Sequence, residues 1–282
     1  MKIAVVGGSG FLGSRLSKRL TAAGSDHIIF DKNTVNKDDV FLDVTKKETL
    51  THLNGSDIII NLAAVHRDDI RPLSLYDDVN IEGAKNICDA AEKYSIQKII
   101  FTSSVAIYGF APLNTDEFGD PNYFNDYGRT KYLAEQVFKK WQLKDKDNRS
   151  LVILRPTVIF GEGNRGNVYN LLRQIATKKF VMLGSGLNIK SIAYVENVAA
   201  FLEYNLKSKS GIHIYNYVDK PDLNMNTLIS FTRKTLFNKS NIGPRLPKFI
   251  GIIIGKLFDL LSFILKINFS ISSIRIKKFM SD

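Results

Sequence analysis

The stretch Lys2–Gly13 reads KIAVVGGSGFLG, and it decides the fold. Its apolar run Ile3–Val6 is typical of a buried strand. Three glycines spaced three residues apart follow this run: Gly7, Gly10 and Gly13. In such a pattern the first glycine permits a tight turn, the second lets a pyrophosphate approach the backbone, and the third lets helix and strand pack closely. The stretch therefore predicts a dinucleotide-binding strand, turn and helix, with Phe11 and Leu12 in the first helical turn, where free N–H groups favour an anion.

The chain beyond this stretch alternates between short apolar runs and helix-length segments. The runs are rich in Ile and Val and lie at His27–Phe30, Ile58–Asn61, Lys98–Thr102 and Leu151–Leu154. The segments between them include Phe11–Ala23, Ile81–Tyr94 and Lys131–Trp141. This alternation predicts an α/β fold, a doubly wound, Rossmann-like parallel sheet with helices on both faces, over residues 1–160. The pattern loosens after Gly161, which predicts a smaller C-terminal substrate lobe (161–190 and 218–282) and segments near 191–217 that return to the sheet.

Composition narrows the class of protein. With 282 residues, 44% of them hydrophobic and 24% charged, the chain has the makeup of a folded enzyme. A single cysteine, Cys88, excludes a disulfide framework and favours a reducing, cytoplasmic compartment. The four histidines lack metal-ligand spacing, so no metal site is predicted.

An acidic residue selects the cofactor. Asp31 follows the second predicted strand, eighteen positions after Gly13, near the place where an acid binds the adenosine ribose hydroxyls. An acid there repels a 2′-phosphate, so the sequence favours NAD over NADP. The neighbouring cation Lys32 works against this preference and adjoins the same part of the cofactor.

A Tyr-x-x-x-Lys pair carries the expected redox chemistry. Tyr127 and Lys131 stand four residues apart at the start of a helix, so they share one face. A free tyrosine has a pKa of about 10 and is a poor base at neutral pH. The Lys131 ammonium beside the phenol would favour the phenolate.

These motifs resemble the extended short-chain dehydrogenase/reductase family of nucleotide-sugar epimerases and dehydratases. The resemblance runs along nearly the whole chain and includes Asp43-Val44, Asn61–Ala64, Thr102–Ser104 and Arg155-Pro156. It implies an NAD site with Asp43 and Val44 beside the adenine. The other residues that it places in or next to the cofactor groove are Leu62, Ala63, Ala64, Asn80, Ser103 and Pro156. It also implies that Ser104 completes a catalytic triad with Tyr127 and Lys131 by binding the reacting sugar oxygen.

The residues after Ser104 narrow the reaction. Family dehydratases need an acid–base carboxylate pair directly after the catalytic hydroxyl residue, and Val105 and Ala106 stand there instead. A dehydratase is therefore not expected. The triad alone does not separate a sugar 4-epimerase from a reductase of UDP-4-keto-6-deoxy sugars.

A finer resemblance addresses the substrate. The stretches Ala64–Gly83, Arg155–Ala176, Tyr215–Asn226 and Ser272–Phe279 are similar to bacterial 4-epimerases of N-acetylglucosaminyl-diphospho-undecaprenol, isomerases that supply lipid-linked N-acetylgalactosamine for O-antigen, and so lipopolysaccharide, synthesis. Epimerases of UDP-N-acetylglucosamine or UDP-glucose are the nearest alternatives. The candidate contacts with the sugar or diphosphate are His66 and Arg67 after the third predicted strand, Arg165 and Asn167 in a glycine-rich loop, and Lys190. A solvated loop position or a polar group satisfied within the core is the alternative for these residues. Lys190 stands where the family has an Arg, which keeps the charge but loses the bidentate fork.

The C-terminal stretch is apolar and basic. Residues 247–269 form an apolar segment interrupted by Lys256 and Asp259, and residues 233–282 carry ten Lys or Arg against two Asp. Lys256, Asp259, Ser262 or Phe263, and Lys266 recur at helical spacing, which predicts an amphipathic helix lying on the cytoplasmic face of the inner membrane. The basic residues expected to meet anionic headgroups are Lys248, Lys266, Lys277 and Lys278. A buried lobe helix or a dimer contact are the alternatives.

The sequence argues against two further classes of function. A non-catalytic dinucleotide-binding scaffold could share this fold, but the intact Ser104, Tyr127 and Lys131 argue against it. The net charge of +11 comes with no nucleic-acid-binding motif, so no nucleic-acid partner is expected. A homodimer through the helices near Ile81–Tyr94 and Lys131–Trp141 is a further possibility that related enzymes suggest.

Overall fold

The computed structural model describes residues 1–67, 70–265, 267 and 273–281. The chain divides into two compact units, and each is described by itself. The first comprises Met1–Gly163 and Ala193–Val218, and the second comprises Asn164–Ile192 and Asp219–Asp282. The chain thus leaves the first unit after Gly163, returns to it over Ala193–Val218, and leaves again.

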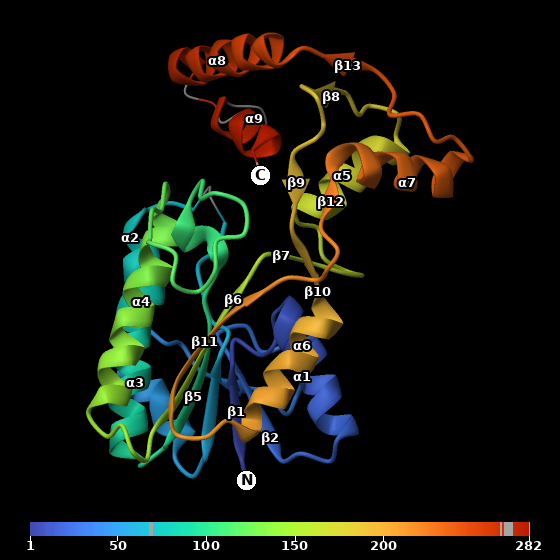
Figure 1. The fold of residues 1–282 in the computed structure, drawn as a ribbon. Helices are drawn as coiled ribbons and strands as arrows, with labels where there is room; N and C mark the ends of the chain where they lie inside the picture. The colour runs from blue at the N-terminus through green and yellow to red at the C-terminus, as the bar shows by residue number, and fades with distance from the viewer. Residues whose placement is uncertain (68–69, 266, 268–272, 282) are drawn as a thin grey trace. The chain divides into compact units, whose positions relative to one another are not determined.

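A parallel sheet forms the centre of the first unit (Figure 1). Its strands are β1 (Ile3–Val6), β2 (His27–Asp31), β3 (Val40–Phe41), β4 (Ile58–Asn61), β5 (Lys98–Thr102), β6 (Ser150–Pro156) and β11 (Gly211–Tyr217). Their order is β11-β6-β5-β4-β1-β2-β3, and all neighbours are parallel. The chain begins in the interior at β1, runs to one edge through β2 and β3, and resumes on the other side of β1 with β4. The predicted doubly wound sheet is confirmed.

Helices cover both faces of this sheet. Helices α3 (Gly83–Lys93) and α4 (Asp126–Leu143) lie on one face, and α1 (Phe11–Ala22) and α6 (Val195–Tyr204) lie on the other (Figure 1). Strand β4 shows why its sequence is continuously apolar: Ile59 enters the core under α3 and α4, while Ile58 and Ile60 enter the core under α1 and α6. A strand buried on both faces needs apolar residues at every position.

Two helices differ from their predicted bounds. Helix α4 begins at Asp126, five residues before the predicted start, because the Asn125 side chain accepts a hydrogen bond from the Gly128 N–H and caps it. Helix α3 follows a π-helical turn, η2 (Asp77–Glu82), rather than beginning at Ile81. The remaining short elements of this unit are η1 (Lys47–Leu53), α2 (Ser74–Tyr76), η3 (Val105–Tyr108), η4 (Asn205–Lys207) and β7 (Val158–Phe160), which pairs with β10 (Ile192–Tyr194).

The second unit is built from helices and two-stranded ribbons. Its strands pair as β9 (Ile189–Lys190) with β12 (Leu223–Asn224) and as β8 (Met182–Leu183) with β13 (Arg245–Leu246). Its helices are α5 (Asn167–Ala176), α7 (Met225–Phe237), α8 (Lys248–Leu265) and α9 (Ser273–Met280). A small core of Ile175, Phe180, Met182, Met225 and Ile229 joins α5 and α7.

Helices α8 and α9 pack against each other through glycines. A Cβ on Gly255 would lie 2.8 Å from the Ser273 Cα, so the two backbones approach closely. The Asp259 carboxylate accepts a hydrogen bond from the Ser273 N–H at 3.2 Å, at the first residue of α9. Asp259 therefore faces α9. Helical spacing had placed it in a solvent-facing polar row, and that prediction is wrong. Lys266 and the side chains of Phe263 and Lys278 lie outside the described residues.

Candidate active site

The glycine-rich turn leaves no room for side chains where strand and helix meet. Gly7 has a φ of +78°, and a Cβ there would lie 2.6 Å from the Ala63 backbone nitrogen. A Cβ on Gly13 would lie 2.4 Å from the Gly8 carbonyl oxygen. Gly10 differs, since its nearest obstacle is the Gly7 carbonyl oxygen at 3.3 Å. Gly7 and Gly13 thus serve packing, and Gly10, at the N-cap of α1, is the position at which the backbone is open to a ligand.

The turn lies where the strand order reverses. Strands β1 and β4 are neighbours at this point, and the Leu62 N–H donates to the Val6 carbonyl at 2.8 Å. The Ala63 N–H is held by the Asn61 side chain at 3.1 Å. Ligands of open α/β sheets bind in the crevice at such a switch point. The structure therefore brings the glycine turn and the Leu62–Ala64 segment together, as a dinucleotide site requires.

Carboxylates surround the expected adenosine end of this site. Asp31 accepts hydrogen bonds from the Ser9 N–H at 3.1 Å and the Asn33 N–H at 2.9 Å. Asp39, which the sequence analysis missed, accepts one from the Ser9 hydroxyl at 3.0 Å. Both acids thus bind Ser9 at the expected adenosine end, where an added 2′-phosphate would meet two negative charges.

The Lys32 cation is engaged by a neighbouring acid. Its Nζ lies 3.3 Å from the buried Asp43 carboxylate. Burial alone would raise the pKa of Asp43, but hydrogen bonds from Thr45 and the charge of Lys32 outweigh it, and the pKa is lowered. Next to Asp43, Val44 is buried against Gly83, where a Cβ would lie 2.7 Å from the valine side chain. Lys32 is therefore paired with a carboxylate and is not an unbalanced cation beside Asp31.

The start of α4 is fixed against the turn that Ser104 opens. A Cβ on Gly128 would lie 2.4 Å from the Ala106 carbonyl oxygen, so only glycine lets the two segments approach this closely. Tyr127, which is half-buried, directly precedes this glycine, and Lys131 follows one helical turn later. The glycine thereby places Tyr127 and Lys131, the predicted catalytic pair, beside the Ser104 turn.

Lys131 is buried within the unit. Its Nζ donates to the Thr102 carbonyl at 2.7 Å and lies 4.5 Å from the centroid of the Phe101 ring. Burial lowers the pKa of the Lys131 ammonium to about 7, while the charge of Glu135 acts in the opposite direction. The lysine is thus charged below this pH and loses its charge as the pH rises through it. Its cationic role depends on groups that oppose desolvation.

Ser103 and Ser104 occupy different environments. The Ser104 Oγ accepts a hydrogen bond from the Ala106 N–H at 3.1 Å and caps η3. Ser103 is buried, and its Oγ has no hydrogen-bond partner among the described residues.

Asn80 joins two walls of the site. Its Oδ1 accepts from the Val65 N–H at 2.9 Å, and its Nδ2 donates to the Val65 carbonyl at 3.1 Å. The same Nδ2 donates to the Thr130 hydroxyl at 2.9 Å. Thr130 directly precedes Lys131 on α4, so Asn80 couples the segment after β4 to this helix.

A buried ionic network behind the site was not predicted. Arg155 donates two hydrogen bonds to the Glu135 carboxylate, at 2.9 and 2.6 Å, and a third to the Tyr108 hydroxyl at 2.5 Å. Tyr108 in turn donates to the Asn216 side chain at 2.9 Å. The sequence contains one signal for this network, because Glu135 stands four residues after Lys131 and so lies on the same helical face.

The candidate substrate residues fall in both units. His66 and Arg67 follow β4 in the first unit and are exposed; the Arg67 carbonyl accepts a hydrogen bond from Tyr76. In the second unit, Arg165 and Asn167 are exposed at the start of α5, while the Lys190 Nζ donates to the Ser281 carbonyl. The structure thus gives each a position within its own unit, and their roles toward substrate stay predictions.

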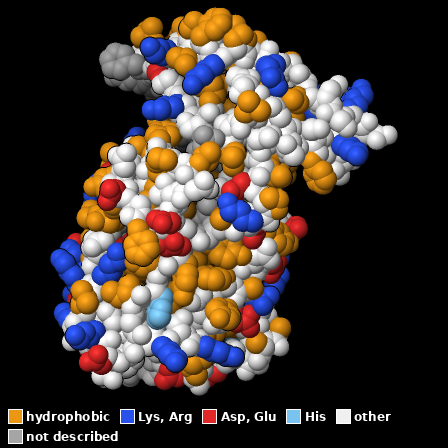
Figure 2. All heavy atoms as spheres, viewed as in Figure 1, with side chains coloured by type: hydrophobic (Ala, Val, Ile, Leu, Met, Phe, Trp, Pro, Cys, Tyr) orange, Lys and Arg blue, Asp and Glu red, His pale blue; other side chains and the backbone are white. Residues whose placement is uncertain are grey.

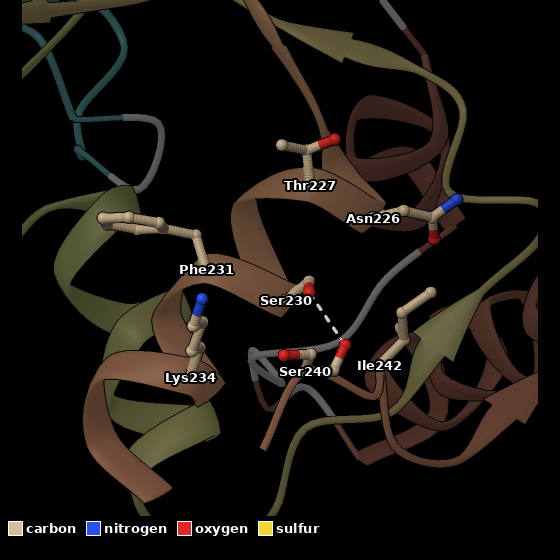
Figure 3. A pocket seen from close by; sticks show the side chains of 7 residues that line it. All are labelled: Asn226, Thr227, Ser230, Phe231, Lys234, Ser240 and Ile242. Atoms are coloured by element: carbon tan, nitrogen blue, oxygen red, sulfur yellow. Dashed lines mark hydrogen bonds between the residues drawn. The ribbon is translucent and has the colours of Figure 1, made fainter. Parts of the chain in front are cut away.

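A cavity of about 520 Å³ in the second unit lies along α7 (Figure 3). Its lining residues are Asn226, Thr227, Ser230, Phe231, Lys234, Ser240 and Ile242. The Ser230 hydroxyl donates to the Ser240 carbonyl at 2.7 Å, so its proton is already engaged within the chain. These residues include no acid–base pair, so the redox chemistry is assigned to the glycine turn and α4.

Comparisons with known proteins agree with this assignment. The N-acetyl-alpha-D-glucosaminyl-diphospho-ditrans,octacis-undecaprenol 4-epimerase of Escherichia coli O157:H7 is 47% identical, over 98% of this chain and 85% of its own length. The UDP-glucose 4-epimerase of Vibrio cholerae is 29% identical over 70% of this chain and 63% of its own length.

The fold also recurs in solved structures. The crystal structure of UDP-N-acetylglucosamine 4-epimerase from Bacillus cereus matches with a TM-score of 0.75 at 22% identity, covering 88% of this chain and 85% of that chain. The family model described as "NAD dependent epimerase/dehydratase family" matches residues 3–217, which include the glycine turn, Ser104, Tyr127 and Lys131. The chain therefore belongs to the NAD dependent epimerase/dehydratase family.

Proposed function

We propose that this protein is an NAD-dependent 4-epimerase that interconverts N-acetylglucosamine and N-acetylgalactosamine joined through diphosphate to undecaprenol. The observation that carries the proposal is the 47% identity to the Escherichia coli enzyme over 98% of the chain. Family membership supports NAD as the cofactor. The open backbone at Gly10 and the acids near Ser9 fit a dinucleotide without a 2′-phosphate.

The residues of the first unit divide the work. The open backbone at Gly10 would hold the pyrophosphate, Gly7 and Gly13 would keep the turn and α1 close enough for this, and Asp31 would bind the adenosine ribose. Bound NAD supplies the oxidation and re-reduction at C4 of the sugar. The Tyr127 phenolate takes the proton of the C4 hydroxyl as a 4-keto sugar forms, and returns it when the sugar is reduced on the opposite face. The Ser104 hydroxyl binds the same sugar oxygen, and the Lys131 ammonium stabilises the phenolate.

The substrate test compares two donors. The purified protein is incubated separately with N-acetylglucosaminyl-diphospho-undecaprenol and with UDP-N-acetylglucosamine, and the N-acetylgalactosamine epimer is measured in each. Conversion of the lipid-linked sugar is the expected result. Conversion of the UDP-sugar alone would contradict the lipid-linked assignment, and consumption of added NADH with a keto sugar would indicate a reductase.

The lipid part of this substrate accounts for the exposed apolar row on α8. Opposite its glycine face, α8 exposes Phe249, Ile252, Ile253, Leu257, Leu260 and Ile264. Figure 2 shows hydrophobic side chains gathered over α8, with Lys and Arg side chains beside them. Lys248, Lys256 and Lys277 are exposed on α8 and α9. This combination favours an anionic lipid surface as the partner, so peripheral association with the inner membrane is part of the proposal.

None of the described helices has the length and apolarity needed to cross a bilayer.

A homodimer through α3 and α4 is a further prediction of the family resemblance. Light scattering on the purified protein would measure its mass, and a mass of one chain at micromolar concentration would contradict the dimer.

A further inference from the structure

A buried ion pair lies one helical turn beyond Lys131. The side chains of Glu135 and Arg155 are 0% and 4% exposed, and the arginine grips both carboxylate oxygens. A buried ion pair is often no more stabilising than apolar residues of the same volume. Stability alone therefore does not explain why an ion pair lies at this position, beside Lys131.

The two ends of the pair face different parts of the active site. At its negative end, Glu135 lies on the buried face of α4 four residues from Lys131, and its charge acts on the lysine. At its positive end, Arg155 donates to the Tyr108 hydroxyl at 2.5 Å and to the Glu117 carbonyl at 3.0 Å. Tyr108 ends the short turn that Ser104 begins. The pair is thus an oriented dipole between the catalytic lysine and the catalytic serine turn.

The surroundings of Lys131 show why this orientation matters. Strand β5 contributes the Thr102 carbonyl and the Phe101 ring, and neither can ionise. On α4, Tyr127 stands one turn before the lysine and Glu135 one turn after it. The charged groups beside Glu135 are Arg155 and Lys139, whose Nζ is 4.0 Å from the carboxylate. Among the described residues, Glu135 is therefore the anion that opposes the desolvation of the lysine.

We propose that Glu135 is a positioning residue that keeps the Lys131 ammonium charged, and that Arg155 holds the Glu135 carboxylate in place for this purpose. The inference rests on the proposed function, in which a charged Lys131 stabilises the Tyr127 phenolate. It adds a group that acts on the reaction through the lysine without touching cofactor or sugar.

The titration of Lys131 tests this directly and needs no substrate. Protein labelled with ¹³C at the lysine ε-carbons is titrated by NMR, and the Lys131 resonance is identified by its loss in Lys131→Arg. In Glu135→Gln the midpoint should fall by about one pH unit or more, a tenfold change in the ionisation constant, because desolvation is no longer opposed. An unchanged midpoint in a folded Glu135→Gln protein would overturn the proposal.

A matched control separates this effect from the general loss of an ion pair. Glu92 also pairs with a lysine and an arginine, Lys144 at 2.7 Å and Arg149 at 3.5 Å, near the far end of α4. Glu92→Gln should leave the Lys131 midpoint where it is in the wild type. An equal fall in both variants would indicate a structural effect and refute the specific role of Glu135.

Glu135→Gln leaves Arg155 buried without its carboxylate partner and can fail to fold. A second variant keeps the proposal testable in that case. The double variant Glu135→Gln/Arg155→Met removes both charges, and it should show the same downward shift of the Lys131 midpoint; an unchanged midpoint there overturns the proposal. In the epimerase assay, the alkaline limb of the pH–rate profile should move to lower pH in step with the midpoint, and a limb that stays in place would break the link to catalysis. An inactive wild type would refute the proposed function and leave the NMR result standing.

Discussion

Tyr127 and Lys131 share one helical face, yet their surroundings differ. Lys131 is buried and donates to the Thr102 carbonyl, whereas Tyr127 is half-buried beside the Ser104 turn. A proton-transferring phenol has to reach the sugar, while the cation that stabilises it acts through its field and can remain buried. The half-buried phenol and the enclosed ammonium thus fit the different roles proposed for them.

Tyr127→Phe should abolish turnover and leave the cofactor bound. The change removes the phenolic oxygen but keeps the ring, so the packing of α4 is retained. Loss of a general acid–base group lowers turnover by about 10²–10⁴-fold. The measurements are the epimerisation rate and NAD affinity by calorimetry. Turnover within a few fold of wild type would refute the role of Tyr127.

Asp31→Ala should weaken NAD binding and narrow the preference for NAD over NADP. The carboxylate is expected to bind the ribose hydroxyls, and hydrogen bonds to a charged group contribute about 1.5–3 kcal/mol, so NAD affinity should fall about 10–100-fold. NADP affinity should fall less, because a repulsive charge is removed at the same time.

Lys32→Ala is the companion variant for Asp31. Lys32 is paired with Asp43, so this variant should leave the ratio of NAD to NADP affinities close to that of the wild type. The measurement is direct binding of both nucleotides to each variant. An unchanged ratio in Asp31→Ala would show that Asp31 does not select the cofactor.

Within the N-terminal strand, turn and helix, Gly10 and Gly13 lie in different environments. Gly13 is buried against the Gly8 backbone, whereas Gly10 is exposed at the N-cap of α1. Sequence spacing alone treats the two positions alike. Their difference follows from the close approach of α1 to the Gly8 backbone, which closes the space at Gly13 and leaves it open at Gly10.

Gly13→Ala should destabilise the fold, while Gly10→Ala should mainly impair cofactor binding. Overpacking of a closed site costs about 1–3 kcal/mol, so the first variant should show a clear fall in Tm. The second should melt near the wild-type Tm but bind NAD more weakly, because the added methyl group occupies the approach of the pyrophosphate. Equal Tm values for both variants would contradict this division, which thermal unfolding and calorimetry together would measure.

At the level of the molecule, the second unit has an exposed apolar helix face that the proposed redox site does not need. Helix α8 buries Gly251 and Gly255 toward α9 and exposes an apolar row on its other side. An exposed apolar patch rimmed by cations is typical of a lipid-binding surface.

Binding to anionic vesicles should therefore depend on α8. Ile253 and Leu257 are 61% and 53% exposed, and burial of such side chains contributes about 1.5–3 kcal/mol each. The variant Ile253→Asp/Leu257→Asp should reduce flotation with phosphatidylglycerol vesicles at least about tenfold. Phe231→Asp, at a 68% exposed apolar residue of α7, is the matched control and should float like wild type. A wild-type protein that stays at the bottom of the gradient would refute the lipid surface.

Local sequence was sufficient for the sheet, the glycine turn and the Tyr127–Lys131 pair. Strand runs, a glycine spacing of three and an i, i+4 spacing each depend on residues within one or two elements, so they can be recognised along the chain. Family resemblance added Ser104, Asn80 and the substrate class. None of these needed knowledge of how distant elements meet.

The tertiary structure decided what depends on contacts between distant segments. It joined Glu135 of α4 to Arg155 at the end of β6, 20 positions apart, and Asp39 to Ser9, 30 positions apart. It also showed that Asp259 accepts a hydrogen bond from the start of α9. Helical spacing alone had assigned Asp259 to a polar row. Hydrogen bonds and ion pairs of this kind form only after the elements have packed, so their partners are set by the fold and not by local spacing.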